Sequence, residues 1–326
     1  MTIDVRSLLD ELTQRRQERD NAADVAMMTI VAFFEDETIG EWLRPRIAQV
    51  AGKQPSRVIV VDAARPANET SVNEAGDWIE VGADDCSPES LASAIGSLAH
   101  RSAPVALIWA SFDMMGDQRF AALAERARTI VYNSSALERD ENGLLALRSF
   151  AQSRPDASIA DLAYMRLAPW QDAIALFFDA KNVIHELFDL RRVEIASGSD
   201  AEAYYLLGWL ASRLEWNACG PREFCNRFGT EIAFRIERMP APRRLQRVTL
   251  ESSQTRFVAE LESGSPSAIA LSVTGAVQYP QRFRPVSNIG TPALIERAVS
   301  ASQQDRVFFE TLLAAGDILS REWGDR

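Results

Sequence analysis

Residues that could do catalytic chemistry are few in this chain of 326 residues, which has only two histidines, His100 and His185. A serine or cysteine nucleophile would need one of them as its base, and no G-x-S-x-G elbow accompanies either. The segment His185–Asp189 resembles the H-E-x-x-H zinc helix but ends in aspartate, and no further ligand cluster lies near it in sequence. We interpret both histidines as structural or surface residues, and we expect no catalytic residue and no metal site.

Glycine-rich loops that cradle phosphates are also missing. A dinucleotide site needs G-x-G-x-x-G after the first strand of its sheet, because only glycine lets the backbone approach the pyrophosphate. Here the first predicted strand ends at Phe34 and is followed by the acidic run Glu35–Glu37, which would repel phosphate. The P-loop pattern fails as well, because Gln54 follows Gly52-Lys53 and Ile47 stands where glycine is required. The sequence therefore predicts no bound cofactor.

The three cysteines, Cys86, Cys219 and Cys225, are too few for a disulfide scaffold. Cys219 and Cys225 lie six residues apart in a loop-like stretch, where they could form a redox pair or half of a metal site. We interpret them instead as two reduced, unrelated thiols. The N-terminus lacks the pattern of a secretory signal, so the expected location is cytoplasmic.

Charge and composition set aside two classes of function. The chain carries 35 basic and 46 acidic residues, a net charge of −11, in a composition typical of a soluble folded protein. Binding to nucleic acid without sequence preference needs a basic surface, and an anionic membrane would repel the chain in the same way. The longest nearly apolar run, Val25–Phe34, is too short for a membrane-spanning helix, which needs about 20 residues. We therefore expect neither a nucleic-acid partner nor a membrane.

One stretch runs against this acidic background. The stretch from Arg222 to Arg247 contains seven arginines and only three glutamates. Guanidinium groups suit a phosphorylated ligand or an acidic protein surface, and the alternative is a solvated outer strand face with a hairpin turn. The seven arginines are Arg222, Arg227, Arg235, Arg238, Arg243, Arg244 and Arg247.

In the first half of the chain, short apolar runs alternate with segments whose apolar residues recur at helical spacing. This rhythm predicts a mainly parallel sheet that helices cover on both faces. The predicted strands are Met28–Phe34, Arg57–Val61, Trp78–Val81, Val105–Trp109 and Thr129–Tyr132, and the predicted helices are residues 2–19, Glu41–Val50, Pro88–His100 and Arg119–Ala127.

The second half opens with helices, and the period changes to two after Cys225. Ser199 and Glu202 form a capping-box signature for a helix over Ala201–Glu215, which follows a strand over Arg191–Ala196. Four alternating segments then predict an antiparallel meander, and a final helix or helix pair covers Thr291–Trp323. The meander segments are Glu231–Arg238, Arg247–Ser252, Arg256–Glu262 and Ile269–Gln278.

These elements predict an α/β protein of two domains. A charge cluster and turn-forming pairs between Glu138 and Ser158 suggest a boundary near residue 155. Residues 1–155 are expected to form a Rossmann-like domain with a mainly parallel sheet and no Gly-rich loop. Residues 156–326 are expected to form an α+β domain with the antiparallel meander.

Two segments of the second half carry a resemblance to a known family. Asp161–Trp170 reads Asp-Leu-Ala-Tyr-Met-Arg-Leu-Ala-Pro-Trp, and Leu206–Trp216 reads Leu-Leu-Gly-Trp-Leu-Ala-Ser-Arg-Leu-Glu-Trp. Together with the strand start Pro55–Val60, they resemble the OpcA family of glucose-6-phosphate dehydrogenase assembly proteins. Its members show Asp-Leu-Asn-Trp-x-Arg-Leu-x-x-Trp-Arg and then Leu-x-Gly-Trp-Leu-x-x-Arg-Leu-x-Trp. The resemblance covers nearly the whole chain, with Ala163 and Tyr164 departing from the first pattern.

The resemblance implies a non-catalytic protein that binds glucose-6-phosphate dehydrogenase and favours its active oligomer in the oxidative pentose phosphate pathway. A sugar-phosphate- or nucleotide-binding sensor or enzyme that uses the stretch Arg222–Arg247 is the alternative. Most of both motifs can also serve packing, and Arg166 and Arg213 can each form a buried ion pair or contact a partner. The sequence leaves the oligomeric state open. The residues that the resemblance assigns to partner binding are Asp161, Arg166, Trp170, Trp209, Arg213 and Trp216.

Overall fold

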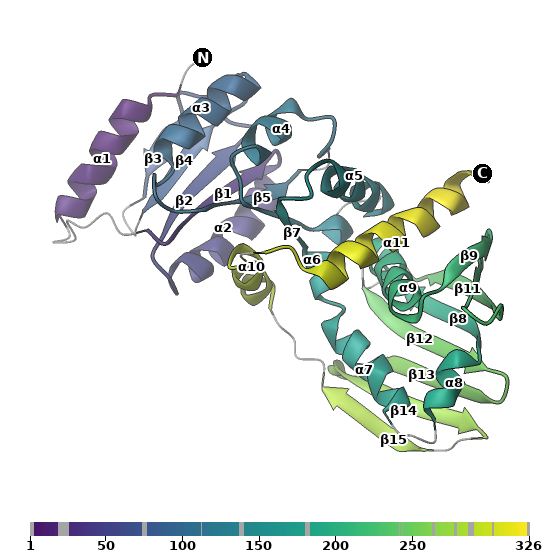
Figure 1. Cartoon of the computed structure of the whole chain (residues 1–326). Coiled ribbons are helices and arrows are strands. Elements are labelled where there is room, and N and C mark those ends of the chain that lie inside the picture. Colours follow the sequence, from purple (N-terminus) through teal and green to yellow (C-terminus); the bar gives the residue numbers. More distant parts are fainter. Residues whose placement is uncertain are drawn as a thin grey trace. The chain divides into compact units, whose positions relative to one another are not determined.

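The computed structural model describes residues 3–324 apart from 19–25, 74–76, 112, 137–139, 180–182, 241, 243, 263–264, 277–278, 286–289 and 302. The chain forms two compact units, each assembled from three segments (Figure 1). The domain boundary near residue 155 stays a prediction, and the compact units are interleaved because the chain crosses between them more than once. Unit 1 comprises Met1–Asn133, Ser149–Leu162 and Gly290–Gln304, and unit 2 comprises Ser134–Arg148, Ala163–Ile289 and Asp305–Arg326.

A mainly parallel sheet of short, apolar strands forms the centre of unit 1, and these strands are β1 (Met28–Phe34), β2 (Ser56–Asp62), β3 (Thr70–Val72), β4 (Trp78–Gly82), β5 (Val105–Ala110), β6 (Thr129–Tyr132) and β7 (Ser158–Asp161). They lie in the order β3-β4-β2-β1-β5-β6-β7, with only β3 antiparallel to its neighbour. The six parallel strands thus follow the 3-2-1-4-5-6 order of doubly wound dinucleotide-binding sheets.

Helices cover both faces of this sheet, which explains why its strands are nearly continuous apolar runs. On one side α2 (Glu37–Ala51) packs with α10 (Thr291–Val299), and on the other α3 (Pro88–Leu98) packs with α1 (Val5–Glu18) and α4 (Gln118–Ala124). Helix α5 (Asp140–Ser153) is shared between the units. Three of these helices begin at side-chain caps, which are Asp36 for α2, Ser87 for α3 and Asp117 for α4.

Unit 2 is built on an eight-stranded, mostly antiparallel sheet, and its strands are β8 (Leu190–Ser197), β9 (Asn217–Gly220), β10 (Glu223–Cys225), β11 (Glu231–Arg238), β12 (Leu245–Ser252), β13 (Thr255–Glu262), β14 (Ser265–Gly275) and β15 (Tyr279–Pro285). Their order is β15-β14-β13-β12-β8-β11-β10-β9, and only β8 and β11 run parallel. The prediction that β11 and β12 belong to one meander is wrong, because β8 lies between them. A period of two identifies the buried face of each strand but not its neighbours.

The helices that accompany this sheet are α6 (Leu162–Met165), α7 (Ala168–Phe178), α8 (Ile184–Phe188), α9 (Asp200–Leu214) and α11 (Arg306–Gly324), with a 3₁₀ turn over Ser134–Ala136. Figure 1 shows α9 and α11 side by side, and Gly208 of α9 lies close against the backbone of α11. A Cβ there would lie 2.6 Å from the carbonyl oxygen of Thr311 and 2.7 Å from the backbone nitrogen of Ala315. Within the described residues, no helix has the length and apolar character needed to cross a membrane.

Candidate functional site

The first family motif lies mostly in the interior. Asp161 is the last residue of β7 in unit 1 and is fully buried. Trp170 lies on α7 in unit 2 and is only 5% exposed. Arg166 is different, because its side chain is 30% exposed and pairs with the buried carboxylate of Glu202. The structure therefore does not bring Asp161, Trp170 and Arg166 to one common surface patch.

The second motif occupies α9 and the turn after it. Trp209 is half-buried, and Arg213 is exposed and forms an ion pair with Glu310 of α11. Hydrogen bonds from Arg306 and then from Arg213 lower the pKa of Glu310. The helix ends at Glu215, which adopts the left-handed conformation with φ 55°. The left-handed residue turns the chain back against the last turn of α9, and the N–H of Trp216 donates to the carbonyl oxygen of Ala211 at 2.9 Å.

The reversal builds a pocket of about 210 Å³ beside the end of α9. Trp216 is nearly buried there, and its ring lies 5.7 Å from the ring of Phe224. Side chains of α8, the end of α9 and the loop after β10 complete the walls. We call this the Trp216 pocket, and it is lined by Leu187, Phe188, Arg213, Leu214, Glu215, Trp216, Asn226, Arg227 and Phe228.

Asn226 organises the loop that forms one wall of the pocket. Its buried side-chain oxygen accepts hydrogen bonds from the N–H groups of Phe228 and Thr230, each at 2.9 Å. Its amide nitrogen donates to the carbonyl oxygen of Phe188 at 3.0 Å, which ties the loop to the end of α8. Gly229 completes the turn with φ +79°, a conformation that favours glycine. One buried side chain thus fixes two walls of the pocket.

The wall residues include an arginine stacked on two aromatic rings. The guanidinium carbon of Arg227 lies 4.9 Å from the ring centroid of Phe228 and 5.4 Å from that of Phe188. The two rings meet edge to face, with centroids 6.4 Å apart. This arrangement holds one arginine and two phenylalanines at the pocket rim. The second motif predicts Arg213 and Trp216 as partner-binding residues, whereas Phe188, Asn226 and Phe228 lie outside both motifs in the chain and are not predicted by them.

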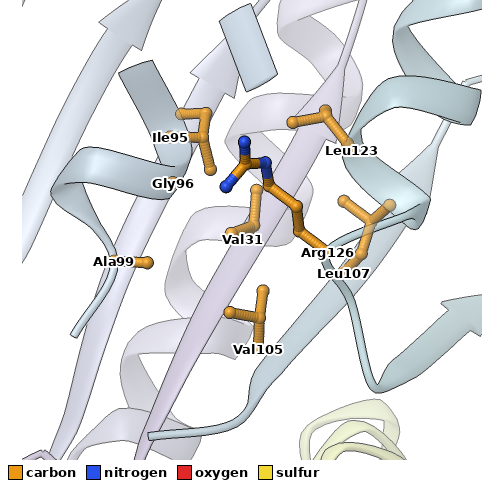
Figure 2. Close-up of a pocket in the computed structure, with 8 residues that line it drawn as sticks. All are labelled: Val31, Ile95, Gly96, Ala99, Val105, Leu107, Leu123 and Arg126. Carbon is orange, nitrogen blue, oxygen red and sulfur yellow. The ribbon is translucent and has the colours of Figure 1, made fainter. Parts of the chain in front are cut away.

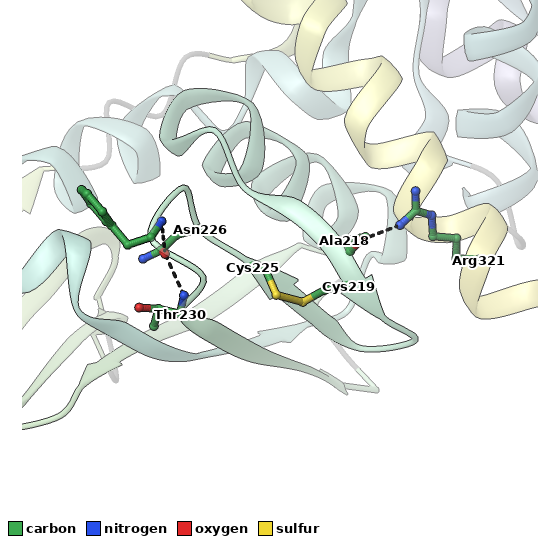
Figure 3. Close-up of a disulfide and its surroundings, with 7 residues drawn as sticks. Ala218, Cys219, Cys225, Asn226, Thr230 and Arg321 are labelled. Atoms are coloured by element: carbon green, nitrogen blue, oxygen red, sulfur yellow. Dashed lines mark hydrogen bonds between the residues drawn. A yellow bond between two sulfur atoms is a disulfide. The ribbon is translucent and has the colours of Figure 1, made fainter.

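Cys219 and Cys225 form a disulfide directly before this loop, with Cα atoms 5.7 Å apart (Figure 3). The prediction of two unrelated reduced thiols is therefore wrong. The stretch is not a loop but a hairpin, in which β9 and β10 pair antiparallel and bring the two cysteines together. Arg321 of α11 adds a long hydrogen bond of 3.4 Å to the carbonyl oxygen of Ala218. Cys86 is the free cysteine, and burial raises the pKa of its thiol.

Among the residues that the structure describes, the arginines between Arg222 and Arg247 do not converge on one anion site. Arg222 pairs with Glu322 at 2.8 Å, Arg238 with Asp200 at 2.6 Å, and Arg247 with Glu237 at 3.0 Å. Arg235 is exposed on β11, and Arg227 lies at the pocket rim. Arg244 is half-buried and its Nε has no hydrogen-bond partner among the described residues, and Arg243 lies outside them. Carboxylate partners are thus already in place for three of the described arginines.

The carboxyl edge of the sheet in unit 1 is where a Rossmann-like fold would hold a dinucleotide, and its residues do not fit one. The side chain of Asp36 accepts a hydrogen bond from the N–H of Thr38 at 2.7 Å, so a carboxylate already occupies the N-terminus of α2. Hydrogen bonds from the Thr38 hydroxyl and then from the Thr38 N–H lower the pKa of Asp36. A pyrophosphate would bind at this helix N-terminus and would meet the negative charges of Glu35–Glu37.

The acidic residue that ends β2 is engaged as well. Asp62 pairs with Arg65 at 3.0 Å and with Arg44 at 3.4 Å, and Arg44 also pairs with Glu80 at 3.2 Å. Burial raises the pKa of Asp62 against the opposing effects of a backbone hydrogen bond and Arg65. In a dinucleotide-binding protein of this fold, an acidic residue near this point accepts a hydrogen bond from a ribose hydroxyl of the cofactor. These side chains do not fit a nucleotide cofactor.

A second cavity, of about 20 Å³, lies among β1, β5, α3 and α4 in unit 1 (Figure 2). Its lining is almost wholly apolar, and Arg126 reaches across it toward Gly96, where a Cβ would lie 2.6 Å from the guanidinium. This volume holds about one water molecule. The cavity is a packing gap and not a site for a substrate.

Among the described residues, neither histidine is part of a cluster of side chains arranged to hold a metal ion. His185 is largely exposed, with its Nε2 atom 3.6 Å from Oε1 of the buried Glu186, and His100 contacts the hydroxyl of Ser102 at 3.2 Å. Within the residues that the structure describes, no group of three or more His, Cys, Asp or Glu side chains is arranged to hold a metal ion.

Residues 157–312 match the family model for the C-terminal domain of the glucose-6-phosphate dehydrogenase subunit. The matched segment contains both motifs and every residue of the Trp216 pocket. An OxPP cycle protein OpcA of Synechocystis is 38% identical over 100 residues, which cover 30% of this chain and 20% of that protein. An OpcA protein of Nostoc punctiforme is 28% identical over 191 residues, 53% of this chain and 41% of that protein. The matched parts thus span less than half of either relative.

Solved oxidoreductases share the fold. KijD10, a 3-ketoreductase from Actinomadura kijaniata in complex with TDP-benzene and NADP, has a TM-score of 0.54 at 12% identity, covering 90% of this chain and 96% of the reductase. A levoglucosan dehydrogenase in complex with NADH and L-sorbose has a TM-score of 0.54 at 11% identity, covering 92% of this chain and 98% of the dehydrogenase. At such low identity the likeness shows the fold alone.

The expected fold class is confirmed: a mostly parallel Rossmann-like sheet and a mostly antiparallel sheet, as in KijD10 and the levoglucosan dehydrogenase. The resemblance read from the two motifs is confirmed as well. Residues 157–312 are thus similar to the C-terminal domain of the glucose-6-phosphate dehydrogenase subunit, and the chain is a distant relative of the OpcA proteins.

Proposed function

We propose that this chain is a non-catalytic assembly factor that binds glucose-6-phosphate dehydrogenase and activates it in the oxidative pentose phosphate pathway. The observation that carries the proposal is the family match over residues 157–312, because that family is described as a subunit of the dehydrogenase. The carboxylates at the edge of the sheet in unit 1 support a non-catalytic role, since they stand where an oxidoreductase of this fold would bind its cofactor.

Activation follows from binding linkage. A protein that binds the assembled, active dehydrogenase more tightly than its inactive form shifts the equilibrium toward the active form by mass action. The shift cannot exceed the ratio of the two affinities, and such couplings typically change an affinity by about 5- to 150-fold. No catalytic group on this chain is needed for that effect.

The alternative, a sensor or enzyme for sugar phosphates or nucleotides at Arg222–Arg247, has less support from the geometry. Phosphate recognition favours several guanidinium groups aimed at one point, and Arg222, Arg238 and Arg247 instead each pair with a different carboxylate. Calorimetry of the isolated chain with glucose 6-phosphate and with NADP separates the two proposals. Saturable binding of either ligand would favour the alternative.

The direct test is the rate of NADP reduction by glucose-6-phosphate dehydrogenase of the same organism, with and without an equimolar amount of this chain. Size-exclusion chromatography with light scattering on the same mixtures reports the mass of the complex. We expect faster turnover together with a larger, co-eluting complex. An unchanged rate without co-elution, with both proteins folded, would contradict the proposal.

A further inference from the structure

Large apolar side chains gather at the rim of the Trp216 pocket. Phe228 is 66% exposed and Phe188 is 43% exposed, and Ile184, one helical turn before Phe188 on α8, is 49% exposed. Among the described residues, three of the six exposed large apolar side chains therefore lie in this one region. Exposed apolar patches with polar surroundings mark protein interaction sites.

The exposed rings are held by the fold. The two N–H groups that bind the Asn226 oxygen belong to Phe228 and Thr230, and the disulfide closes the hairpin directly before the loop. A rim that is already ordered loses little conformational entropy when a partner binds. Phe228 is exposed to solvent, but its backbone is fixed by the hydrogen bond to Asn226. It can therefore contribute to binding without a large loss of conformational entropy.

Three charged side chains line the pocket, Arg213, Glu215 and Arg227, and Arg213 is already paired with Glu310. The guanidinium of Arg227 stacks on the rings of Phe188 and Phe228, and no carboxylate among the described residues lies within ion-pair distance of it. The planar guanidinium of arginine suits bidentate recognition of a carboxylate. The chain as a whole carries a net charge of −11, so an acidic group that approaches is attracted at this rim and repelled over much of the remaining surface.

The size of the pocket limits its occupant. Pockets for drug-sized ligands and cofactors have volumes of about 300–1,000 Å³, and this one has about 210 Å³. Its apolar floor, formed by Leu187, Leu214 and Trp216, suits an inserted apolar side chain. Buried aromatic anchors and arginines surrounded by weaker contacts are the usual composition of an interface hot spot.

From these observations we propose that the Trp216 pocket docks a segment of the dehydrogenase that inserts an apolar side chain and pairs a neighbouring carboxylate with Arg227. The inference rests on the proposed function and names the surface that performs it. It also explains why the second family motif ends in an arginine and a tryptophan that reach the same pocket.

The test measures the dissociation constant for the dehydrogenase of the same organism by calorimetry, with complex mass from size-exclusion light scattering. The full chain is compared with its Phe228→Ala, Arg227→Ala and Arg227→Glu variants. The matched control is Trp42→Ala in unit 1, because Trp42 is a 39% exposed aromatic residue on which Arg46 stacks at 4.2 Å. All four changes are at the surface, and near-equal melting temperatures verify that the variants fold.

We expect Phe228→Ala and Arg227→Ala each to weaken binding at least tenfold, Arg227→Glu to weaken it further, and Trp42→Ala to stay within twofold of the unchanged chain. Binding within twofold for all the pocket variants would overturn the docking site and leave the proposed function standing. Absence of any complex with the unchanged chain would overturn both. A chain that is dimeric alone and becomes monomeric on Phe228→Ala would assign the pocket to a second copy and overturn the inference.

Discussion

Arg166 and Glu202 form an ion pair in which Nε lies 2.9 Å from Oε1, with the glutamate side chain only 2% exposed. The second carboxylate oxygen of Glu202 accepts a hydrogen bond from the N–H of Leu245, at the start of β12, at 2.8 Å. Arg166 also donates to the hydroxyl of Ser135. One carboxylate therefore joins the middle of the first family motif, the first turn of α9 and the sheet of unit 2.

This arrangement predicts that Arg166→Ala lowers the free energy of unfolding by about 2–3 kcal/mol, because a buried carboxylate then loses its cation. Arg213→Ala is the matched control, since Arg213 belongs to the second motif but pairs with Glu310 at the surface. An exposed pair contributes about 0–1 kcal/mol. Urea denaturation of both variants measures the difference. Equal losses of stability would show that the Arg166 pair is no more structural than the Arg213 pair.

The close approach of α9 and α11 predicts that Gly208→Ala is strongly destabilising. Its Cβ would collide with backbone atoms of Thr311 and Ala315, which cannot move aside without separating the helices. We expect a loss of about 2–3 kcal/mol from overpacking. Gly229→Ala is the contrast, since its Cβ would meet nothing within 4 Å and only the positive φ costs about 1 kcal/mol. Thermal denaturation checks the order, and a smaller loss at Gly208 would contradict it.

The parallel sheet could be predicted because each of its main strands is a continuous apolar run. The predicted bounds of β1 and β6 agree with the structure, β4 and β5 are each one residue longer at one end, and β2 is one residue longer at both ends. The short strands β3, β7, β9 and β10 were missed. Strands of three or four residues have too little pattern to reveal them, and they form because a neighbouring strand supplies hydrogen bonds.

The candidate site could be predicted only in part. The motifs identify Arg213 and Trp216, but the pocket exists because α8 and the loop after β10 come to the end of α9. Phe188 and Phe228 are 40 residues apart in the chain, and each alone is typical of a core residue. Asn226 and Gly229 could have suggested a tight turn, which would have placed Arg227 and Phe228 at its exposed tip.

The disulfide predicts the stability of the β9–β10 hairpin. Replacing both Cys219 and Cys225 by serine should lower the free energy of unfolding by about 2 kcal/mol, since the bond closes a short loop with a sequence separation of six. Hydrogen exchange should increase first in the hairpin and in the loop that carries Phe228. Cys86→Ser, which breaks no cross-link, should change neither quantity substantially. Three reactive thiols in the unfolded, unreduced chain would contradict the pairing, which leaves only one.

The end of α8 predicts how acid affects the rim of the Trp216 pocket. Asp189 follows Phe188, and its carboxylate accepts hydrogen bonds from the hydroxyl and the N–H of Ser253 and pairs with Arg191 at 3.0 Å. The Ser253 hydroxyl bond, followed by the N–H bond and Arg191, lowers the pKa of Asp189 below 3.8. An acid whose pKa is lowered on folding contributes stability above its unfolded pKa and loses it as the pH falls through the folded pKa.

Asp189→Asn should therefore be less stable than the unchanged chain at pH 7, and the difference should shrink as the pH falls from about 5 toward the folded pKa of Asp189. Chemical denaturation of both proteins over this range measures the difference, and carboxyl NMR of Asp189 locates the folded pKa independently. A difference that stays constant or grows in acid would mean that the ionised carboxylate does not stabilise this end of α8. In that event the Asn226 hydrogen bond to the carbonyl oxygen of Phe188 would be the main contact that positions Phe188. The NMR signals of Phe188 would then shift more in Asn226→Ala than in Asp189→Asn.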